Sequence, residues 1–200
     1  MTVNDPLLSA TEYIDHLDPT IQTLAQSLAR RSADEARYAR DAFEWVRDEI
    51  PHTTTTGRQV VTAKASDVLA ERTGICHAKA NLLAALLRAR GIPAGFGFQR
   101  VTVGEDASDG YCLHALAIAM LGGNLVPLDP RPGIEFGSVG PVSVDLSETN
   151  LPGLWNNPDQ GTMDVLRTSS CLDDAMRNLP DAPSAPPDDP SFTTTRPSRV

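Results

Sequence analysis

Apolar residues in the first 90 positions recur at intervals of three and four, the spacing of amphipathic helices. The pattern begins after Asp18-Pro19, an N-cap followed by a proline whose missing N–H costs nothing there. A second stretch stops at Pro51, since proline cannot continue a helix. We therefore expect helices over about 19–28, 34–49, 66–72 and 75–90, with Ser66 as the N-cap of the third and a loop or extended edge over 52–57.

The segment 75–90, ICHAKANLLAALLRAR, has the strongest helical pattern in the chain. Cys76, Ala80, Leu83 and Leu87 share one face, and further alanines and leucines widen the apolar surface. Such wide coverage indicates a helix that is buried on more than one side. Gly91 is the expected C-terminal stop, with Pro93 just beyond it.

After Pro93 the apolar period changes to two, which is typical of strands. We expect strands over 94–103, 111–121 and 125–129, with Gly122-Gly123 as a hairpin turn between the last two. Helices followed by a hairpin sheet indicate an α+β domain.

The final 20 residues differ in composition from the rest of the chain. They are rich in proline and poor in large apolar side chains, so they cannot bury enough surface to offset their ordering entropy. We expect a single domain over 1–180 and a disordered tail over 181–200, and removal of the residues after about Ser184 should leave the fold intact.

The composition is that of an acidic globular protein, with 200 residues, 40% hydrophobic content and a formal net charge of −9. Because this charge repels phosphate groups, neither nucleic acid nor an anionic membrane is expected as a partner. The N-terminal residues lack the basic and apolar regions of a signal peptide, and no apolar run reaches the roughly 18 residues of a membrane span. We expect a cytoplasmic location, where free thiols persist.

The odd number of cysteines, three, leaves at least one thiol unpaired, and Cys76 is the candidate nucleophile. It lies two residues after Gly74, at the predicted start of the most apolar helix. The free N–H groups and the dipole at a helix start favour a thiolate, and they can also stabilise an oxyanion. From spacing alone, the interpretation that Cys76 is only a small buried core residue at a helix start is as good as the interpretation that it is a nucleophile.

A thiolate also needs a base, and His114 is the best placed of the four histidines. It lies inside the apolar strand YCLHALAIAML. His16 precedes an N-cap and His52 follows a proline, so both are expected in solvent. His77 neighbours Cys76 on a helix, where consecutive side chains diverge by about 100°, and it is therefore not expected to be the base.

The hairpin geometry predicts a carboxylate partner for His114. With Gly122-Gly123 at the turn, counting back places Leu116 opposite Asp129. Side chains alternate along a strand, so His114 lies on the same face as Leu116, with Asp129 as its diagonal neighbour at roughly 7–8 Å between backbone positions. Asp129, an ionised group in a predicted strand, needs such a partner.

These residues together resemble a known family. The stretch RTGICHAKANLLAALLRARGIPAGFGFQRV resembles the nucleophile region of the transglutaminase-like superfamily, YCLHALAIAML its histidine strand and LVPLDPRPG its aspartate strand. The resemblance covers roughly residues 35–135 and is nearest to bacterial transglutaminase-like cysteine proteinases. It implies a papain-like core, with a central nucleophile helix packed on an antiparallel sheet, and a catalytic triad of Cys76, His114 and Asp129.

The expected chemistry is acyl transfer through a thioester on Cys76, with a peptide, a protein or a small amide or thioester as substrate. Passage of the acyl group to water makes a peptidase or amidase, whereas passage to an amine makes an amide-forming acyltransferase. Two further alternatives are an arylamine N-acetyltransferase-like enzyme and a non-catalytic binding module with the same fold. The oligomeric state is left open.

Two positions depart from the resembled family: Leu116 stands where an aromatic residue is frequent, and Asn124-Leu125 where a tryptophan is common. A less bulky cleft wall would admit water, which at about 55 M needs no binding site. On this basis we expect hydrolysis of a peptide or isopeptide-like amide, unless these positions lie outside the cleft.

The remaining polar residues suggest no cofactor or metal. Neither a C-x-x-C nor an H-x-x-x-H spacing occurs, and no glycine-rich phosphate loop is present. The segment GEDASDG is only a weak calcium-loop candidate. Cys112 is expected as a packed strand residue, and Cys171 as an exposed residue on a helix.

Overall fold

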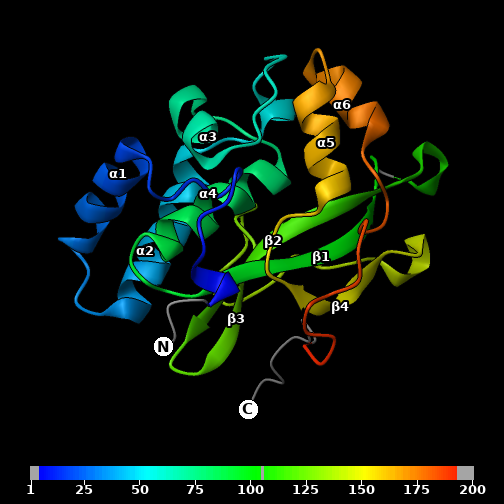
Figure 1. The fold of residues 1–200 in the computed structure, drawn as a ribbon. Helices are drawn as coiled ribbons and strands as arrows, with labels where there is room; N and C mark the ends of the chain where they lie inside the picture. The colour runs from blue at the N-terminus through cyan, green and yellow to red at the C-terminus, as the bar shows by residue number, and fades with distance from the viewer. Residues whose placement is uncertain (1–4, 105, 193–200) are drawn as a thin grey trace.

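The computed structural model describes residues 5–104 and 106–192 and has an α+β fold (Figure 1), as predicted. Its four antiparallel strands lie in the order β3-β2-β1-β4. The strands are β1 (Ala94–Thr102), β2 (Tyr111–Leu121), β3 (Asn124–Leu128) and β4 (Thr149–Trp155). The helices are α1 (Pro19–Ala29), α2 (Glu35–Glu49), α3 (Ala65–Glu71), α4 (Cys76–Arg88), α5 (Gln160–Thr168) and α6 (Leu172–Asn178).

Helix α4 is the centre of the core. Every residue from His77 to Arg88 is buried, because α1, α2 and α3 pack on one side of the helix and β2 on the other. This agrees with the apolar coverage that predicted a helix buried on more than one side. The Tyr38 hydroxyl of α2 donates a 2.7 Å hydrogen bond to the Leu86 carbonyl, which joins two of these layers.

Of the two predicted N-caps, Asp18 and Ser66, the structure contains the first, and it adds Asp34 as the N-cap of α2. Asp18 accepts a hydrogen bond from the Thr20 N–H, and Asp34 accepts one from the Arg37 N–H. The prediction of Ser66 as an N-cap is wrong, since Lys64 holds that position. Ser66 lies in the first turn of α3 instead, where its N–H and hydroxyl both donate to Asp15.

The β2–β3 hairpin has the predicted register. Leu121 pairs with Asn124 and Ala117 pairs with Leu128, so the count that related His114 to Asp129 is correct. Gly122 and Gly123 form the turn with φ of 56° and 81°. Two consecutive positive φ values suit a two-residue hairpin turn and explain why both positions are glycine.

The segment after residue 180 differs from the prediction of a disordered tail. Over residues 181–192 it runs beside β4, where Leu154 and Asp189 exchange two backbone hydrogen bonds of 2.8 and 3.0 Å. The Trp155 Nε1–H also donates to the Ala185 carbonyl. Because β4 is an edge strand, its free N–H and C=O groups supply hydrogen-bond partners for this segment. The low apolar content of the segment, on which the prediction of disorder rested, does not reveal these partners. The rest of the predicted tail, 193–200, lies outside the described residues.

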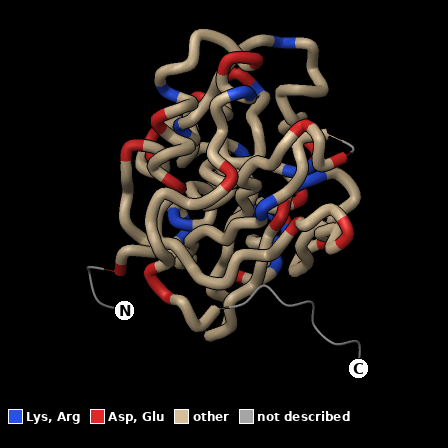
Figure 2. Tube along the Cα trace, turned by 90° about the vertical axis from the view of Figure 1, so that its right-hand side faces the viewer, with Lys and Arg blue, Asp and Glu red and all other residues tan. Residues whose placement is uncertain are grey.

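Charged residues are spread around the molecule rather than gathered on one side (Figure 2). In the described ranges, no helix has the length and hydrophobicity that a membrane crossing requires.

Candidate active site

A pocket of about 650 Å³ lies at the N-terminal end of α4. Its walls come from the end of α2, the start of α4, strand β2 and the loop after β3. The pocket brings together all three sequence-predicted site residues, which come from α4, β2 and the loop after β3, since β3 ends one residue before Asp129. The charged and nucleophilic residues that line it are Arg47, Asp48, His52, Cys76, Lys79, His114, Asp129 and Arg131.

Cys76 is the first residue of α4, as predicted. Ile75 at the N-cap supplies no side-chain hydrogen bond, and the first N–H groups of a helix have no intrahelical acceptor. These N–H groups are therefore available to an anion beside the sulfur. Burial raises the pKa of the Cys76 thiol, but His77 and His114 more than offset this effect and hold the pKa well below its ordinary value. Cys76 is thus suited to be a thiolate.

His114 and Asp129 form a buried pair, with 3.2 Å between Nε2 and Oδ1. Burial lowers the pKa of His114, whereas the Cys76 thiolate and the Asp129 carboxylate raise it, and the net result is a pKa of about 9. Burial raises the pKa of Asp129, but His114 and Arg131 lower it strongly. At neutral pH the favoured state is therefore a thiolate, an imidazolium and a carboxylate.

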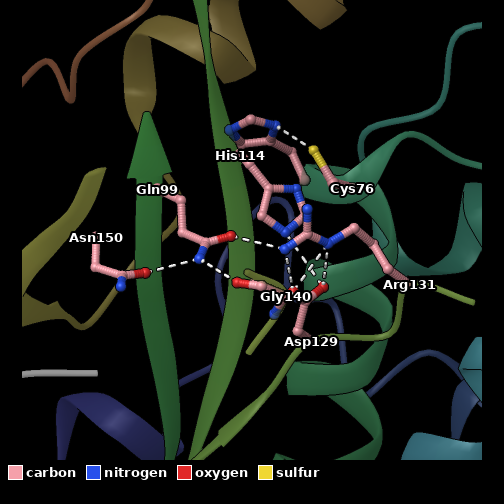
Figure 3. Close-up of polar contacts among 8 residues, drawn as sticks. Cys76, Gln99, His114, Asp129, Arg131, Gly140 and Asn150 are labelled. Carbon is pink, nitrogen blue, oxygen red and sulfur yellow. Dashed lines mark hydrogen bonds and ion pairs between the residues drawn. The ribbon is translucent and has the colours of Figure 1, made fainter. Parts of the chain in front are cut away.

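Asp129 has more partners than His114 alone (Figure 3). The guanidinium of Arg131 donates to both carboxylate oxygens: to Oδ2 from Nη2 at 2.6 Å and from Nε at 2.9 Å, and to Oδ1 from Nε at 3.1 Å. The Gly140 N–H adds a 2.9 Å bond to Oδ2. Arg131 also donates to the Gln99 Oε1, and Gln99 donates to the Gly140 carbonyl. This network holds the carboxylate in one orientation for His114.

Sequence reasoning missed Arg131, Gln99 and Gly140. A basic residue two positions after an aspartate, in LDPRPG, was the only available signal for Arg131. Gln99 lies opposite His114 in the β1–β2 register, which becomes visible only once the pairing of the two strands is known. Gly140 comes from a loop with no periodic pattern, so its position depends entirely on tertiary structure.

Three histidines differ from their sequence predictions. His77 does not point away from Cys76: its Nδ1 lies 3.4 Å from the sulfur, because the ring packs against Phe98 of β1. His52 was expected in solvent but is half-buried and lines the pocket, since its backbone bridges to Gly74 just before α4. His16 was also expected in solvent and is buried.

Comparison with known proteins places the chain in a family. Residues 22–130 match the family model of the Transglutaminase-like superfamily. The chain belongs to the transglutaminase-like superfamily. A search of curated proteins found no match.

Among solved structures, the transglutaminase-like chain is similar to a "Putative Cysteine Protease" from Cytophaga hutchinsonii, at 24% identity and a TM-score of 0.52 over 64% of this chain and 41% of that one. It is also similar to the periplasmic domain of TgpA from Pseudomonas aeruginosa, at 23% identity and a TM-score of 0.46 over 64% and 50% of the two chains. The chain thus spans half or less of the length of these structures. The first likeness supports the transglutaminase-like fold.

The two departures from the family pattern lie outside the pocket. Leu116 is fully buried in a cluster with Ile118 and Leu154, and Asn124 is exposed beside the hairpin turn. Neither Leu116 nor Asn124-Leu125 is among the residues that line the pocket. The argument for a more open cleft wall was therefore wrong, and these positions have no bearing on the acyl acceptor.

The other two thiols differ from Cys76. Cys112, in β2, is half-buried, and burial raises its pKa to about 12. Cys171 is the N-cap residue of α6 and is half-buried, although it was expected to be exposed on a helix. Neither residue lines the pocket.

Proposed function

We propose that this transglutaminase-like protein is an enzyme that transfers acyl groups through a thioester on Cys76 and hydrolyses a peptide or another amide. The observation that carries the proposal is the shared pocket: Cys76 lies at a helix start beside a buried His114–Asp129 pair. Nucleophile, base and orienting carboxylate are the parts that covalent acyl transfer requires. The name of the Cytophaga hutchinsonii structure is consistent with a peptidase.

In the first half-reaction the Cys76 thiolate attacks the substrate carbonyl carbon, and the carbonyl oxygen becomes an oxyanion. The N–H groups at the start of α4 donate to this oxyanion. The C–N bond then breaks, His114 gives its proton to the departing amine, and a thioester remains on Cys76. Asp129 keeps the His114 ring oriented and stabilises its charged form.

In the second half-reaction His114 is neutral and takes a proton from water, which attacks the thioester. The thiolate leaves, the product is a carboxylic acid, and His114 again carries its proton. An amine in place of water would give a new amide, and this acyltransferase is the alternative function. Hydrolysis is preferred because water at about 55 M needs no binding site.

Intact-mass spectrometry with activated acyl esters tests the proposal. The wild-type protein is expected to gain one acyl group and then lose it, whereas Cys76→Ala gains none. Cys171→Ala is the matched control, because Cys171 lies outside the pocket, and it should behave as the wild type does. Acylation that persists in Cys76→Ala would contradict the proposed nucleophile.

The same reaction run with primary amines separates the two functions. Free acid should remain the main product at millimolar amine if the enzyme is a hydrolase. Amide that forms faster than free acid would assign the protein to the acyltransferases instead.

A further inference from the structure

Lys79 is a buried cation that faces the pocket without a partner. It is 2% exposed and lines the pocket together with Cys76 and His114. The other cations of the pocket are each paired: Arg47 with Asp48 at 2.6 Å, and both Arg131, at 2.6 Å, and the imidazolium of His114, at 3.2 Å, with Asp129. Within the described ranges, the ammonium of Lys79 has no ion pair within 4.0 Å and no hydrogen bond.

The helix places Lys79 on the substrate side of Cys76. Three residues make slightly less than one turn, so the two side chains lie on neighbouring parts of the same face of α4. Helical side chains also tilt toward the N-terminus of their helix, and here that end of α4 is the pocket. A substrate whose carbonyl carbon meets the sulfur therefore passes near the ammonium of Lys79.

The energetics of burial favour an anionic occupant. Because the Lys79 side chain is almost fully buried, its ammonium loses part of its hydration, and a direct anionic partner would offset that loss. Burial lowers the pKa of Lys79 to about 8, although the negative charges of Asp129, Cys76 and Asp48 oppose this fall. Lys79 therefore remains mostly protonated at pH 7. With two carboxylates paired to two arginines, Lys79 is the one pocket cation in the described ranges that has no direct ion pair.

We propose that Lys79 forms an anion subsite, and that the acyl donors of this enzyme carry a carboxylate that pairs with its ammonium. The proposal rests on the proposed function and adds the substrate class. The carboxylate belongs either to the acyl part of the donor, as an acidic side chain does, or to the C-terminus of the departing peptide. Both sources present the same chemistry to Lys79.

A binding experiment tests the subsite without turnover. The chain has two lysines, Lys64 and Lys79, so protein labelled with ¹³C at lysine Cε gives two signals, which Lys79→Met assigns. Cys76→Ala protein is titrated with N-acetylglutamate α-amide and with N-acetylalanine, which carry a side-chain and a C-terminal carboxylate. Either or both should shift the Lys79 signal saturably, and its titration midpoint should rise with the bound anion. The neutral N-acetylglutamine α-amide should leave it unchanged.

A kinetic experiment tests specificity with donors that differ in one group. Glutaryl p-nitroanilide carries a terminal carboxylate, and its carboxamide analogue is neutral at the same length. Peptides with free and amidated C-termini form the second pair. Lys79→Met should lower kcat/KM for the carboxylate donor about 10- to 100-fold, the range for a hydrogen bond to a charged group, and change that of the neutral donor little. Lys64→Met is the control, since Lys64 lies outside the pocket, and it should keep the preference.

The outcomes separate this proposal from the proposed function. If the Lys79 signal responds to neither carboxylate while wild-type protein still forms the acyl-enzyme, the subsite is overturned and acyl transfer stands. If the carboxylates bind at Lys79 but activated esters never acylate Cys76, the anion site stands and the acyl-transfer function fails. Equal kcat/KM for charged and neutral donors in the wild type would also overturn the subsite.

Discussion

At the scale of the residue, the environment of each thiol sets its reactivity. The thiolate is the reactive form, and the pKa of Cys76 is held low by His77 and His114, whereas burial raises that of Cys112 to about 12. Limiting iodoacetamide at neutral pH is therefore expected to modify Cys76 before the other two cysteines. Peptide mapping by mass spectrometry measures the order. Earlier modification of Cys112 or Cys171 would contradict the assignment of the nucleophile.

The carboxylate of Asp129 is expected to matter more for activity than for stability. Asp129→Asn removes the charge that orients His114 and holds it protonated, so turnover should fall by about 10²–10⁴. An asparagine carbonyl can still accept from the Gly140 N–H, and the half-exposed Arg131 can turn to solvent. Asp164→Asn, on the surface of α5, is the control. Unchanged turnover in Asp129→Asn would exclude the orienting role.

The His114 pKa predicts the alkaline limit of activity. Burial lowers this pKa, but the charges of Cys76 and Asp129 raise it above 6.5 to about 9. The imidazolium is therefore kept at neutral pH and lost as the pH rises through about 9, and kcat/KM should fall there. The stability that it contributes should be full below about pH 6.5 and be lost over the same rise. An alkaline limit near 6.5 would mean that the pair does not form.

At the scale of the element, Arg88 joins the end of α4 to three other parts of the fold. It is 3% exposed and donates to the carbonyls of Ser9, Ala94 and Asn156, with distances from 2.6 to 3.0 Å. Arg88→Leu leaves these acceptors without a donor, so the free energy of unfolding should fall by about 3 kcal/mol or more. Urea unfolding measures this. The exposed neighbour Arg90 is the control, since Arg90→Leu should change stability by less than about 0.5 kcal/mol.

At the scale of the whole molecule, the segment 181–192 covers β4 rather than extending freely. Truncation after Ser184 removes the carbonyl partner of Trp155 and both backbone bonds between Leu154 and Asp189. The melting temperature should therefore fall, by about 5 °C for a net loss near 2 kcal/mol. Asp188→Ala tests the same segment at full length, because it removes the carboxylate that accepts a 2.8 Å hydrogen bond from the Asn156 N–H. An unchanged melting temperature in both variants would favour the disordered tail that the composition predicted.

Some features of this molecule follow from local sequence. The three- and four-residue periods before Gly91 correspond to α1, α2 and α4, and the two glycines at 122 and 123 determine the hairpin register. That register predicted a contact between His114 and Asp129, and the structure confirms it, with 3.2 Å between Nε2 and Oδ1. Strand β4 was not predicted, because Pro152 and Gly153 interrupt its alternation. The apolar period and the turn geometry are set by residues only a few positions apart. These features therefore do not depend on contacts between residues distant in the sequence.

The site itself was decided by tertiary structure. The hydrophobic pattern of the sequence does not show how far Cys76 lies from the hairpin. Only the packing of α4 on β2 brings the sulfur to His114. The packing of α4 also buries Lys79, which has no ion pair within the described ranges, and the contact of the His77 ring with Phe98 of β1 holds that ring beside the sulfur. Contacts between elements depend on how whole faces fit together, which the period of one segment does not encode. The sequence by itself determined α1, α2, α4, the β2–β3 hairpin and the His114–Asp129 pair, whereas the tertiary structure decided what surrounds the thiol.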